Sequence, residues 1–359
     1  MPKSAYIHIP FCKSKCKYCT FISFNKPELM TGYIYSLLKE ITENYAGESL
    51  DTLYFGGGTP SLIKPELIEK IIKKFSLSSD CEITLEINPD DTTVDYINDI
   101  KSIGINRLSI GSQTFNDQIL EQIGRRHNSK QIIQTVEMAK GSGFDNISVD
   151  LIYGLPNQDL NNLKTDLEKF LNLNIQHIST YGLKIEDGSY FGKYKPDNLP
   201  DEDIQADMYE FINKILENNG FYRYEISNFS KKGFESKHNI NYWNNEEYYG
   251  FGVSAHGYVD GIRYSNVCNI EQYMEKPLQH EYGKMLTQKE KLEEEIFLGF
   301  RKTEGINTKK INSLYGINFE QKYKSVLDKY SDYLEKTTLG YKLNLQGTLL
   351  SNIILSEFL

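Results

Sequence analysis

The stretch Ser4–Phe24, SAYIHIPFCKSKCKYCTFISF, determines how this sequence is interpreted. It contains Cys12, Cys16 and Cys19, three of the five cysteines of the chain, in the spacing C-x3-C-x2-C. An apolar strand pattern over residues 6–9 leads directly into these cysteines. Thiolate ligands select zinc, copper(I) or iron–sulfur clusters. Because a structural zinc takes four ligands and a [4Fe–4S] cluster has four irons, three cysteines indicate either a missing ligand or an iron that is left open.

The alternatives to a metal site are a chance grouping of cysteines and a disulfide set. A strand pattern follows Met1 almost at once, so we expect no secretory signal and a cytoplasmic protein. Intracellular cysteines at metal-ligand spacing are more often ligands or catalytic groups than disulfides. Cys81 and Cys268 have no Cys or His at ligand spacing, and we expect both to be small core residues.

Composition limits the classes of partner. The chain has 359 residues, enough for one large domain and a smaller one. A net charge of −9 and a pI of about 5.4 argue against nucleic acid as a partner. Every apolar run is much shorter than the roughly 18 residues of a membrane span, so we do not expect an integral membrane protein.

Short apolar runs alternate with helical patterns over the first half of the chain. The runs that we interpret as strands are Ala5–Ile9, Thr52–Phe55, Glu82–Ile87, Arg107–Ile110, Ile147–Ile152 and His177–Leu183. The helical patterns between them are Leu29–Tyr45, Glu66–Phe75, Tyr96–Ile103, Ile132–Lys140 and Leu160–Leu173. This alternation predicts an α/β fold with a parallel sheet. Periodicity does not separate an open (β/α)6 barrel from a doubly wound sheet, but in both folds ligands bind at the C-terminal ends of the strands.

The rest of the chain divides into two further parts. Residues 186–286 are less regular, with a helical pattern at Ile204–Leu216, a strand pattern at Tyr222–Ile226 and then a polar, aromatic loop rich in Asn. Residues 287–359 return to helical patterns and predict a mostly helical C-terminal domain. We therefore expect a core over 1–185 that carries the cysteine site, a barrel extension over 186–286, and a C-terminal domain over 287–359.

The longer string Y-x-H-I-P-F-C-x3-C-x-Y-C, which ends at Cys19, resembles the signature of radical S-adenosylmethionine (SAM) enzymes. Within them it is similar to the oxygen-independent coproporphyrinogen III oxidases and their relatives, the heme chaperones. The resemblance implies an open (β/α)6 partial barrel in which Cys12, Cys16 and Cys19 hold a [4Fe–4S] cluster. The fourth iron would bind the amino and carboxylate groups of SAM. In this superfamily one electron from the cluster cleaves SAM to methionine and a 5′-deoxyadenosyl radical.

A glycine motif, Gly56-Gly57-Gly58-Thr59-Pro60, follows the second strand pattern directly. Glycine lets a backbone approach a ligand closely, although three glycines alone are equally typical of a plain strand-to-helix turn. The motif resembles the GGxTP-type loop of the family, whose backbone contacts the amino end of SAM. The resemblance thus implies SAM contacts at Gly57, Gly58 and Thr59.

Polar residues also occur near the ends of the following strands. A carboxylate in an apolar strand is unfavourable unless it is paired, and an arginine could satisfy it through bidentate hydrogen bonds. From the residues alone, a structural polar network inside the barrel is an alternative. The resemblance implies contacts with SAM, or with its adenine and the cluster, at six positions: Tyr6, Tyr18, Glu86, Gln113, Arg125 and Asp150.

A later motif separates the two branches of the family. The run His238-Asn239-Ile240-Asn241-Tyr242-Trp243 matches H-N-x-x-Y-W, a pattern that resembles the heme chaperones and differs from the oxidases. Imidazole is a common axial ligand of heme iron, so His238 is the candidate heme ligand. Without the resemblance, a single histidine in a polar loop is more often a hydrogen-bonded surface residue. His256 is a second candidate, which we expect to line the SAM pocket, and His8 is expected near the cluster.

Two departures weaken the oxidase interpretation. The oxidases carry a fourth cysteine two residues after the third, where this chain has Phe21. They also have an N-terminal arm of several dozen residues, whereas the first cysteine here is residue 12. We therefore expect a heme chaperone that takes up heme and passes it to an acceptor, a membrane or respiratory protein being one class of candidate, with a separate electron donor for the cluster. The alternatives are a coproporphyrinogen III oxidase, which would be an enzyme, and a radical SAM enzyme that acts on another substrate.

Overall fold

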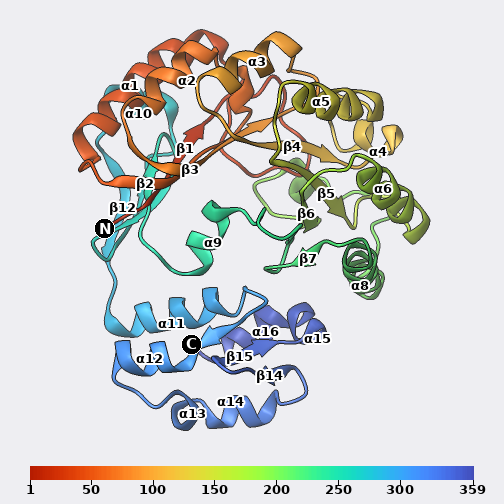
Figure 1. Ribbon diagram of the computed structural model, residues 1–359, viewed down its shortest axis with the longest axis vertical. Helices are drawn as coiled ribbons and strands as arrows, with labels where there is room; N and C mark the ends of the chain where they lie inside the picture. The colour runs from red at the N-terminus through yellow and green to blue at the C-terminus, as the bar shows by residue number, and fades with distance from the viewer.

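One nine-stranded sheet forms the main body of the protein, and a computed structural model describes all residues, 1–359 (Figure 1). Six neighbouring strands of this sheet run parallel, in the order of the sequence. They are β1 (Ser4–Ile9), β2 (Ser49–Gly57), β3 (Ser76–Ile87), β4 (Arg107–Gln113), β5 (Ile147–Tyr153) and β6 (His177–Gly182). The predicted α/β fold with an open (β/α)6 partial barrel is therefore confirmed, because the strand order is linear and the sheet does not close on itself.

Helices cover the outer face of this sheet (Figure 1). They are α1 (Met30–Asn44), α2 (Pro65–Ile72), α3 (Val94–Ser102), α4 (Asp117–Gln122), α5 (Ser129–Gly141), α6 (Leu160–Asn172) and α8 (Glu202–Asn218). Two short 3-10 helices, Pro27–Leu29 and Pro60–Leu62, precede α1 and α2. Local sequence fixes where the helices begin, since Asn128 and Asp159 each form a capping box with the residue three positions later. Every strand of the barrel thus delivers its C-terminal end to the same rim.

Short strands from residues 222–251 extend the sheet at both edges. On one side β8 (Asn228–Ser230) pairs antiparallel with β6, and β7 (Tyr222–Arg223) pairs with β8. On the other side β9 (Tyr249–Phe251) pairs parallel with β1. The middle part of the chain therefore contributes the edge strands on both sides of the barrel sheet.

Other elements of the middle part lie against the barrel. Three strands form an antiparallel sheet: β10 (His256–Val259), β11 (Ile262–Asn266) and β12 (His280–Met285). The helices are α7 (Tyr190–Lys193), α9 (Lys237–Trp243) and α10 (Ile270–Glu275). Helix α9 lies on the inner side of the curved sheet, between it and the C-terminal residues (Figure 1). The H-N-x-x-Y-W motif therefore forms a helix, whereas its polar, Asn-rich composition had predicted a loop.

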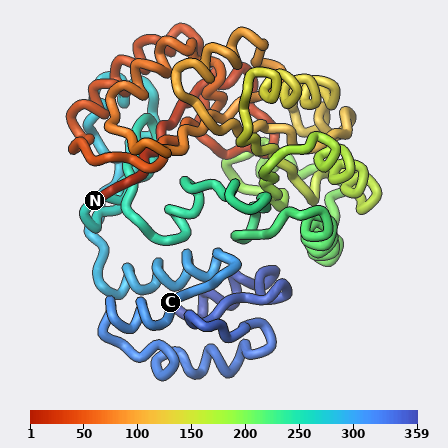
Figure 2. The backbone as a smooth tube through the Cα atoms, viewed as in Figure 1, coloured from red at the N-terminus to blue at the C-terminus, as the bar shows by residue number.

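The C-terminal residues form a separate layered unit (Figure 2). Its helices are α11 (Gln288–Gly299), α12 (Thr308–Tyr315), α13 (Phe319–Lys322), α14 (Lys324–Lys329), α15 (Leu345–Leu349) and α16 (Ser351–Ser356). It also contains an antiparallel sheet that the sequence did not predict, with β13 (Ile306–Asn307), β14 (Leu334–Lys336) and β15 (Gly340–Leu343). These strands have two to four residues, too few to show a period in the sequence.

Buried hydrophobic side chains divide between the two units. A cluster of 51 buried residues runs from Ala5 to Tyr273, and a second cluster of 12 runs from Leu292 to Phe358. Each unit therefore has its own core. None of the helices is both long and apolar enough to span a membrane.

Candidate cluster and cofactor site

The three cysteines lie on the loop between β1 and α1. Backbone hydrogen bonds close this loop at its base, from Cys12 N to Phe24 O (3.1 Å) and from Phe24 N to Pro10 O (2.7 Å). The His8 ring reinforces it, since Nε2 lies 2.9 Å from the carbonyl oxygen of Ile22. The position of His8 beneath the loop agrees with the expectation from the sequence. The cysteine loop is therefore held by the backbone and by β1, independently of the thiols.

All three thiols of the loop are free and partly exposed. Burial raises the pKa of the Cys19 thiol, and the nearby Cys16 and Cys12 thiols raise it further. The three groups thus influence one another electrostatically. No three Cys, His, Asp or Glu side chains converge on the spacing of a single metal ion. A single zinc needs such convergence, whereas a [4Fe–4S] cluster offers a separate iron to each thiolate.

The glycine motif packs against the base of the cysteine loop. Gly57 has a φ of +112°, and a Cβ at this position would lie 2.5 Å from the His8 ring. A Cβ on Gly58 would lie 2.7 Å from the carbonyl oxygen of Phe11. Thr59 donates its backbone N–H to the same carbonyl (2.8 Å), and its hydroxyl lies 3.5 Å from Cys12 Sγ. These positions need glycine because the backbone of one loop runs directly over the other.

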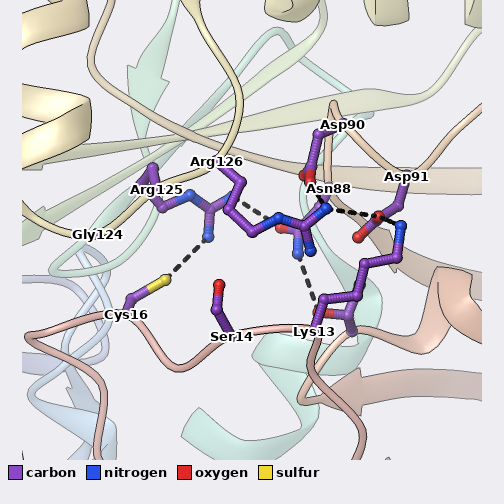
Figure 3. A pocket seen from close by; sticks show the side chains of 10 residues that line it. Lys13, Ser14, Cys16, Asn88, Asp90, Asp91, Gly124, Arg125 and Arg126 are labelled. Carbon is purple, nitrogen blue, oxygen red and sulfur yellow. Dashed lines mark hydrogen bonds and ion pairs between the residues drawn. The ribbon is translucent and has the colours of Figure 1, made fainter. Parts of the chain in front are cut away.

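Arg125 connects the cysteine loop to the strand ends (Figure 3). Its Nη1 lies 3.6 Å from Cys16 Sγ, and its Nη2 donates to Gly111 O (2.6 Å) and to Asn88 Oδ1 (2.7 Å). Asn88 in turn donates from Nδ2 to Thr59 Oγ1 (2.9 Å). The guanidinium therefore holds a positive charge beside one thiol and links three loops at the rim of the barrel.

A small polar pocket opens next to this arginine (Figure 3). Its wall includes an ion-pair network in which Arg126 lies 2.8 Å from Asp90 and Lys13 pairs with Asp91. Lys13 belongs to the cysteine loop, so the network joins that loop to the segment after β3. The lining is almost entirely polar and carries both signs of charge.

Glu86 and Asp150 point into the interior of the barrel from β3 and β5. Glu86 accepts hydrogen bonds from the Tyr54 hydroxyl (2.8 Å) and from Gly57 N (3.2 Å). Burial raises the pKa of Glu86 to about 7 and that of Asp150 to about 6. The Ser109 hydroxyl donates to Asp150 at 3.4 Å. Both carboxyl groups retain accepting capacity towards hydroxyl groups of a ligand.

Two buried polar atoms at this rim have no hydrogen-bond partner. One is Gln113 Oε1, whose residue adopts a left-handed backbone conformation with a φ of +61°, and the other is Arg125 Nε. Leaving a buried polar atom unpaired costs about 1–3 kcal/mol. A ligand with both donors and acceptors would satisfy the two atoms, and the amino-acid end of SAM has this character. The residues present therefore fit a bound SAM.

The two tyrosines predicted beside the adenine and the cluster lie on β1 and on the cysteine loop. The Tyr6 hydroxyl is 3.1 Å from His8 Nδ1, and burial raises its pKa well above the usual value. Tyr18 packs against a small apolar group under the loop. Burial raises its pKa as well, while the charge of Arg125 opposes that shift. His256, expected at the SAM pocket, begins β10; burial and, to a smaller extent, the neighbouring His256 lower the pKa of His8 to about 4.

His238 lies on α9 inside the barrel and away from the cysteine loop. It is only 1% exposed, and both ring nitrogens have partners: Nδ1 is 2.7 Å from Thr52 Oγ1 and Nε2 is 2.9 Å from the Tyr242 hydroxyl. The Tyr54 ring stacks on it at 4.9 Å. Burial, helped by the charge of Arg107, lowers the pKa of His238 to about 3, so the ring is neutral. In this conformation neither nitrogen is free for iron.

Several residues of the site were not found from the sequence. Asn88 and His127 complete the surroundings of Arg125, since His127 Nδ1 lies 3.3 Å from Arg125 Nη2. Arg107, which is 2% exposed with an unpaired Nε, is the buried cation of the barrel interior. Their positions in the sequence could have indicated a role in the site, because Asn88 directly follows β3 and Arg107 is the first residue of β4. The expectation for Cys268 was wrong, because its side chain is exposed, whereas Cys81 is buried as expected.

Comparison with known proteins gives first the class and then the family. The sequence profile of the radical SAM superfamily matches residues 6–170, and that of the HemN C-terminal domain matches residues 286–349. These matches place the chain in the radical SAM superfamily. The heme chaperone HemW of Lactococcus lactis is 43% identical over 339 residues, with 90% of this chain and 87% of the relative covered. The heme chaperone HemW of Bacillus subtilis is 38% identical, with 99% of both chains covered. The chain therefore belongs to the HemW family of heme chaperones.

A solved structure supports the fold. The coproporphyrinogen III oxidase HemN of Escherichia coli, described as a radical SAM enzyme, superposes with a TM-score of 0.88. The match covers 99% of this chain and 90% of that chain, at 22% sequence identity. At this level of identity the likeness concerns the fold alone.

Proposed function

We propose that this protein binds heme and transfers it to an acceptor protein, on a radical SAM scaffold that holds one [4Fe–4S] cluster and SAM. Cys12, Cys16 and Cys19 are the cluster ligands. The observation that carries the scaffold is the combination of three free thiols on one closed loop with two unpaired polar atoms at the adjoining strand ends. The heme part rests on membership of a family whose relatives are named heme chaperones.

The proposed SAM contacts follow the rim of the barrel. Arg125 and Gln113 hold the amino-acid end, where Nε and Oε1 lack partners. Glu86 and Asp150 accept hydrogen bonds from ribose hydroxyls deeper in the barrel. The remaining contacts are with backbone or rings: Gly57, Gly58, Thr59, Tyr6 and Tyr18. When bound, the cluster supplies one electron for the reductive cleavage of SAM, and this cleavage is either part of the function or replaced by a gating role of intact SAM.

The residues of the chain perform three tasks around these groups. Arg125 keeps a positive charge beside Cys16, with Nη1 3.6 Å from the sulfur. The Tyr6 hydroxyl and His8 hold one another, so the ring of Tyr6 is fixed in the interior. Burial of Glu86 beneath Gly57 keeps bulk water from its carboxyl group. The site is thus prepared before any ligand arrives.

The division of labour that we propose follows the three parts of the chain. Residues 1–185 hold the cluster and SAM, residues 186–286 extend the barrel, and residues 287–359 form the C-terminal domain. The motif of the middle part predicts His238 as the heme ligand, but in this structure Thr52 and Tyr242 occupy both ring nitrogens, so a heme site elsewhere on the chain is the alternative. The acceptor is a heme-dependent protein, and a reduced electron carrier supplies electrons to the cluster.

The test is anaerobic and uses the whole chain. The cluster is reconstituted, hemin is added, and its transfer to an apo-heme protein is followed by the absorption of the acceptor. We expect binding and transfer of hemin. In parallel, coproporphyrinogen III is supplied with SAM and a reductant. Decarboxylated product at catalytic turnover would establish the oxidase alternative, and no binding of hemin would overturn the chaperone proposal.

A further inference from the structure

Helix α7 lies directly against the cysteine loop, although more than 160 residues separate them in the sequence. Phe191 N donates to Lys17 O (2.9 Å), and the Thr20 hydroxyl donates to Glu186 Oε2 (2.9 Å). Lys17 and Thr20, which make these two hydrogen bonds, both belong to the cysteine loop. The two segments therefore form one continuous surface at the mouth of the barrel.

This surface is fixed in shape. Phe191 is 3% exposed and packs in a small apolar core that also contacts Tyr18 of the cysteine loop. A Cβ on Gly192 would lie 2.1 Å from the carbonyl oxygen of Glu186, so the chain turns back on itself very closely here. The Ser189 hydroxyl accepts from Gly192 N (2.9 Å) and donates to Glu186 O (2.8 Å). The outward side chains of α7 thus stand on a rigid base.

Two aromatic rings project outwards from this base. Tyr190 and Tyr194 are each 54% exposed, and their ring centroids lie 4.9 Å apart. Lys17 Nζ lies 5.9 Å from the Tyr190 ring, and Lys193 Nζ lies 5.4 Å from the Tyr194 ring. We refer to Tyr190, Tyr194, Lys17 and Lys193 as the tyrosine platform. Exposed paired rings flanked by ammonium groups offer apolar contact and positive charge together.

The charge of the platform is not neutralised. The chain as a whole has a net charge of −9, and 19 ion pairs tie its charged groups together. Lys184, close by in sequence, pairs with Glu186 at 3.0 Å. No carboxylate lies within 4 Å of the ammonium groups of Lys17 or Lys193. The platform is therefore a local cationic site on an acidic protein, which favours an anionic ligand.

We propose that heme docks on the tyrosine platform, with its macrocycle against Tyr190 and Tyr194 and its two carboxylates towards Lys17 and Lys193. This inference rests on the proposed function and assigns the place where the heme is held. Tyrosine oxygen is an established ligand of heme iron, so the platform offers an axial ligand as well as contact with two rings that are tilted by 43° to one another. It is exposed, whereas His238 is enclosed and its ring nitrogens are engaged.

The position of the platform also couples heme to the cluster. Lys17 lies between Cys16 and Cys19, and its carbonyl oxygen anchors α7 through Phe191. The predicted cluster ligands and one side of the platform therefore share the cysteine loop. If the cluster changes the affinity for heme through this loop, heme changes the affinity for the cluster by the same factor, which the comparison of cluster states below measures.

The test measures hemin binding to the full-length protein by difference absorption, with and without a reconstituted cluster. The test variant is Tyr190→Ala/Tyr194→Ala, and the charge variant is Lys193→Glu. The matched control is Tyr35→Ala, which removes a ring that is 58% exposed on α1. Hemin dimethyl ester, which lacks the two charges, serves as a second probe. We expect the double variant to bind hemin at least about tenfold more weakly, and the ester to be insensitive to Lys193→Glu.

Each outcome is decisive. If wild-type protein binds hemin and the double variant binds it equally well, the platform is overturned while the proposed function stands. If His238→Gln abolishes binding and the platform variants do not, heme lies inside the barrel and the platform is overturned. If the wild type binds no hemin in either cluster state, both the proposed function and the platform fall. Circular dichroism of each variant checks that it folds.

Discussion

The Arg125 guanidinium at the barrel rim and the His238 ring in the barrel interior differ in whether all of their polar atoms have partners. At the rim, Arg125 Nε and Gln113 Oε1 are buried without partners. In the interior, both nitrogens of His238 are hydrogen-bonded and its ring is stacked. An unpaired buried group costs about 1–3 kcal/mol, so a ligand that pairs with Arg125 and Gln113 removes this cost, whereas a ligand of His238 must first displace two partners. The H-N-x-x-Y-W motif is easily recognised in the sequence, yet its histidine has no free nitrogen, whereas Arg125 and Gln113 at the rim have free polar atoms for a ligand.

The cysteine substitution should give the largest effect. Cys16→Ser removes one of the three proposed cluster ligands, and we expect iron content to fall from about four irons per reconstituted chain to near zero, with loss of the brown colour. Iron and sulfide analysis measures this. Cys268→Ser is the control, because Cys268 is exposed and distant in sequence from the loop. An unchanged iron content in Cys16→Ser would remove this thiol from the ligand set.

The arginine substitution tests the rim itself. Arg125→Met removes a charged group that makes three hydrogen bonds and, in our proposal, contacts SAM. Hydrogen bonds to charged groups contribute about 1.5–3 kcal/mol, so SAM affinity should fall by about 10- to 150-fold. Equilibrium dialysis with the cluster-loaded protein measures the affinity. Arg125→Lys keeps the charge without the fork of donors, and a normal affinity for both variants would show that SAM does not use this residue.

The interior should respond to pH. The pKa of His238 is about 3 in the folded protein and near 6.5 in the unfolded chain, so between these values the unfolded chain binds more protons. The free energy of unfolding therefore falls as pH decreases below about 6.5, by up to about 1.4 kcal/mol per pH unit for this histidine, and is unaffected above it. Urea titrations from pH 4 to 7 should show a shallower dependence for His238→Gln than for the wild type.

That comparison has an internal control. Other buried histidines, such as His8 and His127, also have lowered pKa values, but they are present in both proteins and cancel in the difference. If the free energy of unfolding depends on pH equally in His238→Gln and the wild type, the His238 ring binds a proton in the folded protein as readily as in the unfolded chain. The lowered pKa of His238 would then be wrong.

The smallest effect should come from the ion pairs beside the rim. Lys13 is 47% exposed and pairs with Asp91, which also lies 3.9 Å from Arg126. The Asp91 side chain is only 3% exposed but keeps Arg126 nearby when Lys13 is removed, so Lys13→Ala should lower the free energy of unfolding by about 1 kcal/mol, the upper end for pairs with an exposed partner. Chemical denaturation measures the change. A loss well above this value would show that the network holds the cysteine loop in place.

Much of the fold could be predicted because the barrel repeats one pattern. Each βα unit joins an apolar run to an amphipathic helix, so all six strands were found, although β3 begins at Ser76, six residues before the predicted start at Glu82. The C-terminal sheet and α9 were missed, since very short elements have no measurable period. The residues of the candidate site were likewise predicted only in part. Residues within motifs, such as Cys12 and Gly57, could be named, whereas Asn88 and Arg107 act through contacts that only the three-dimensional arrangement creates.

The pairing of β9 with β1 has a consequence for the biosynthesis of the protein. Ala5 and Ile7 face Tyr249 and Phe251, so the outer edge of the first strand is covered by residues made some 240 positions later. At about 5–20 residues per second, ribosomes need on the order of ten to fifty seconds to make that stretch. During this interval the strand that leads into the cysteine loop has one open edge, a row of unpaired backbone groups that could pair with another chain.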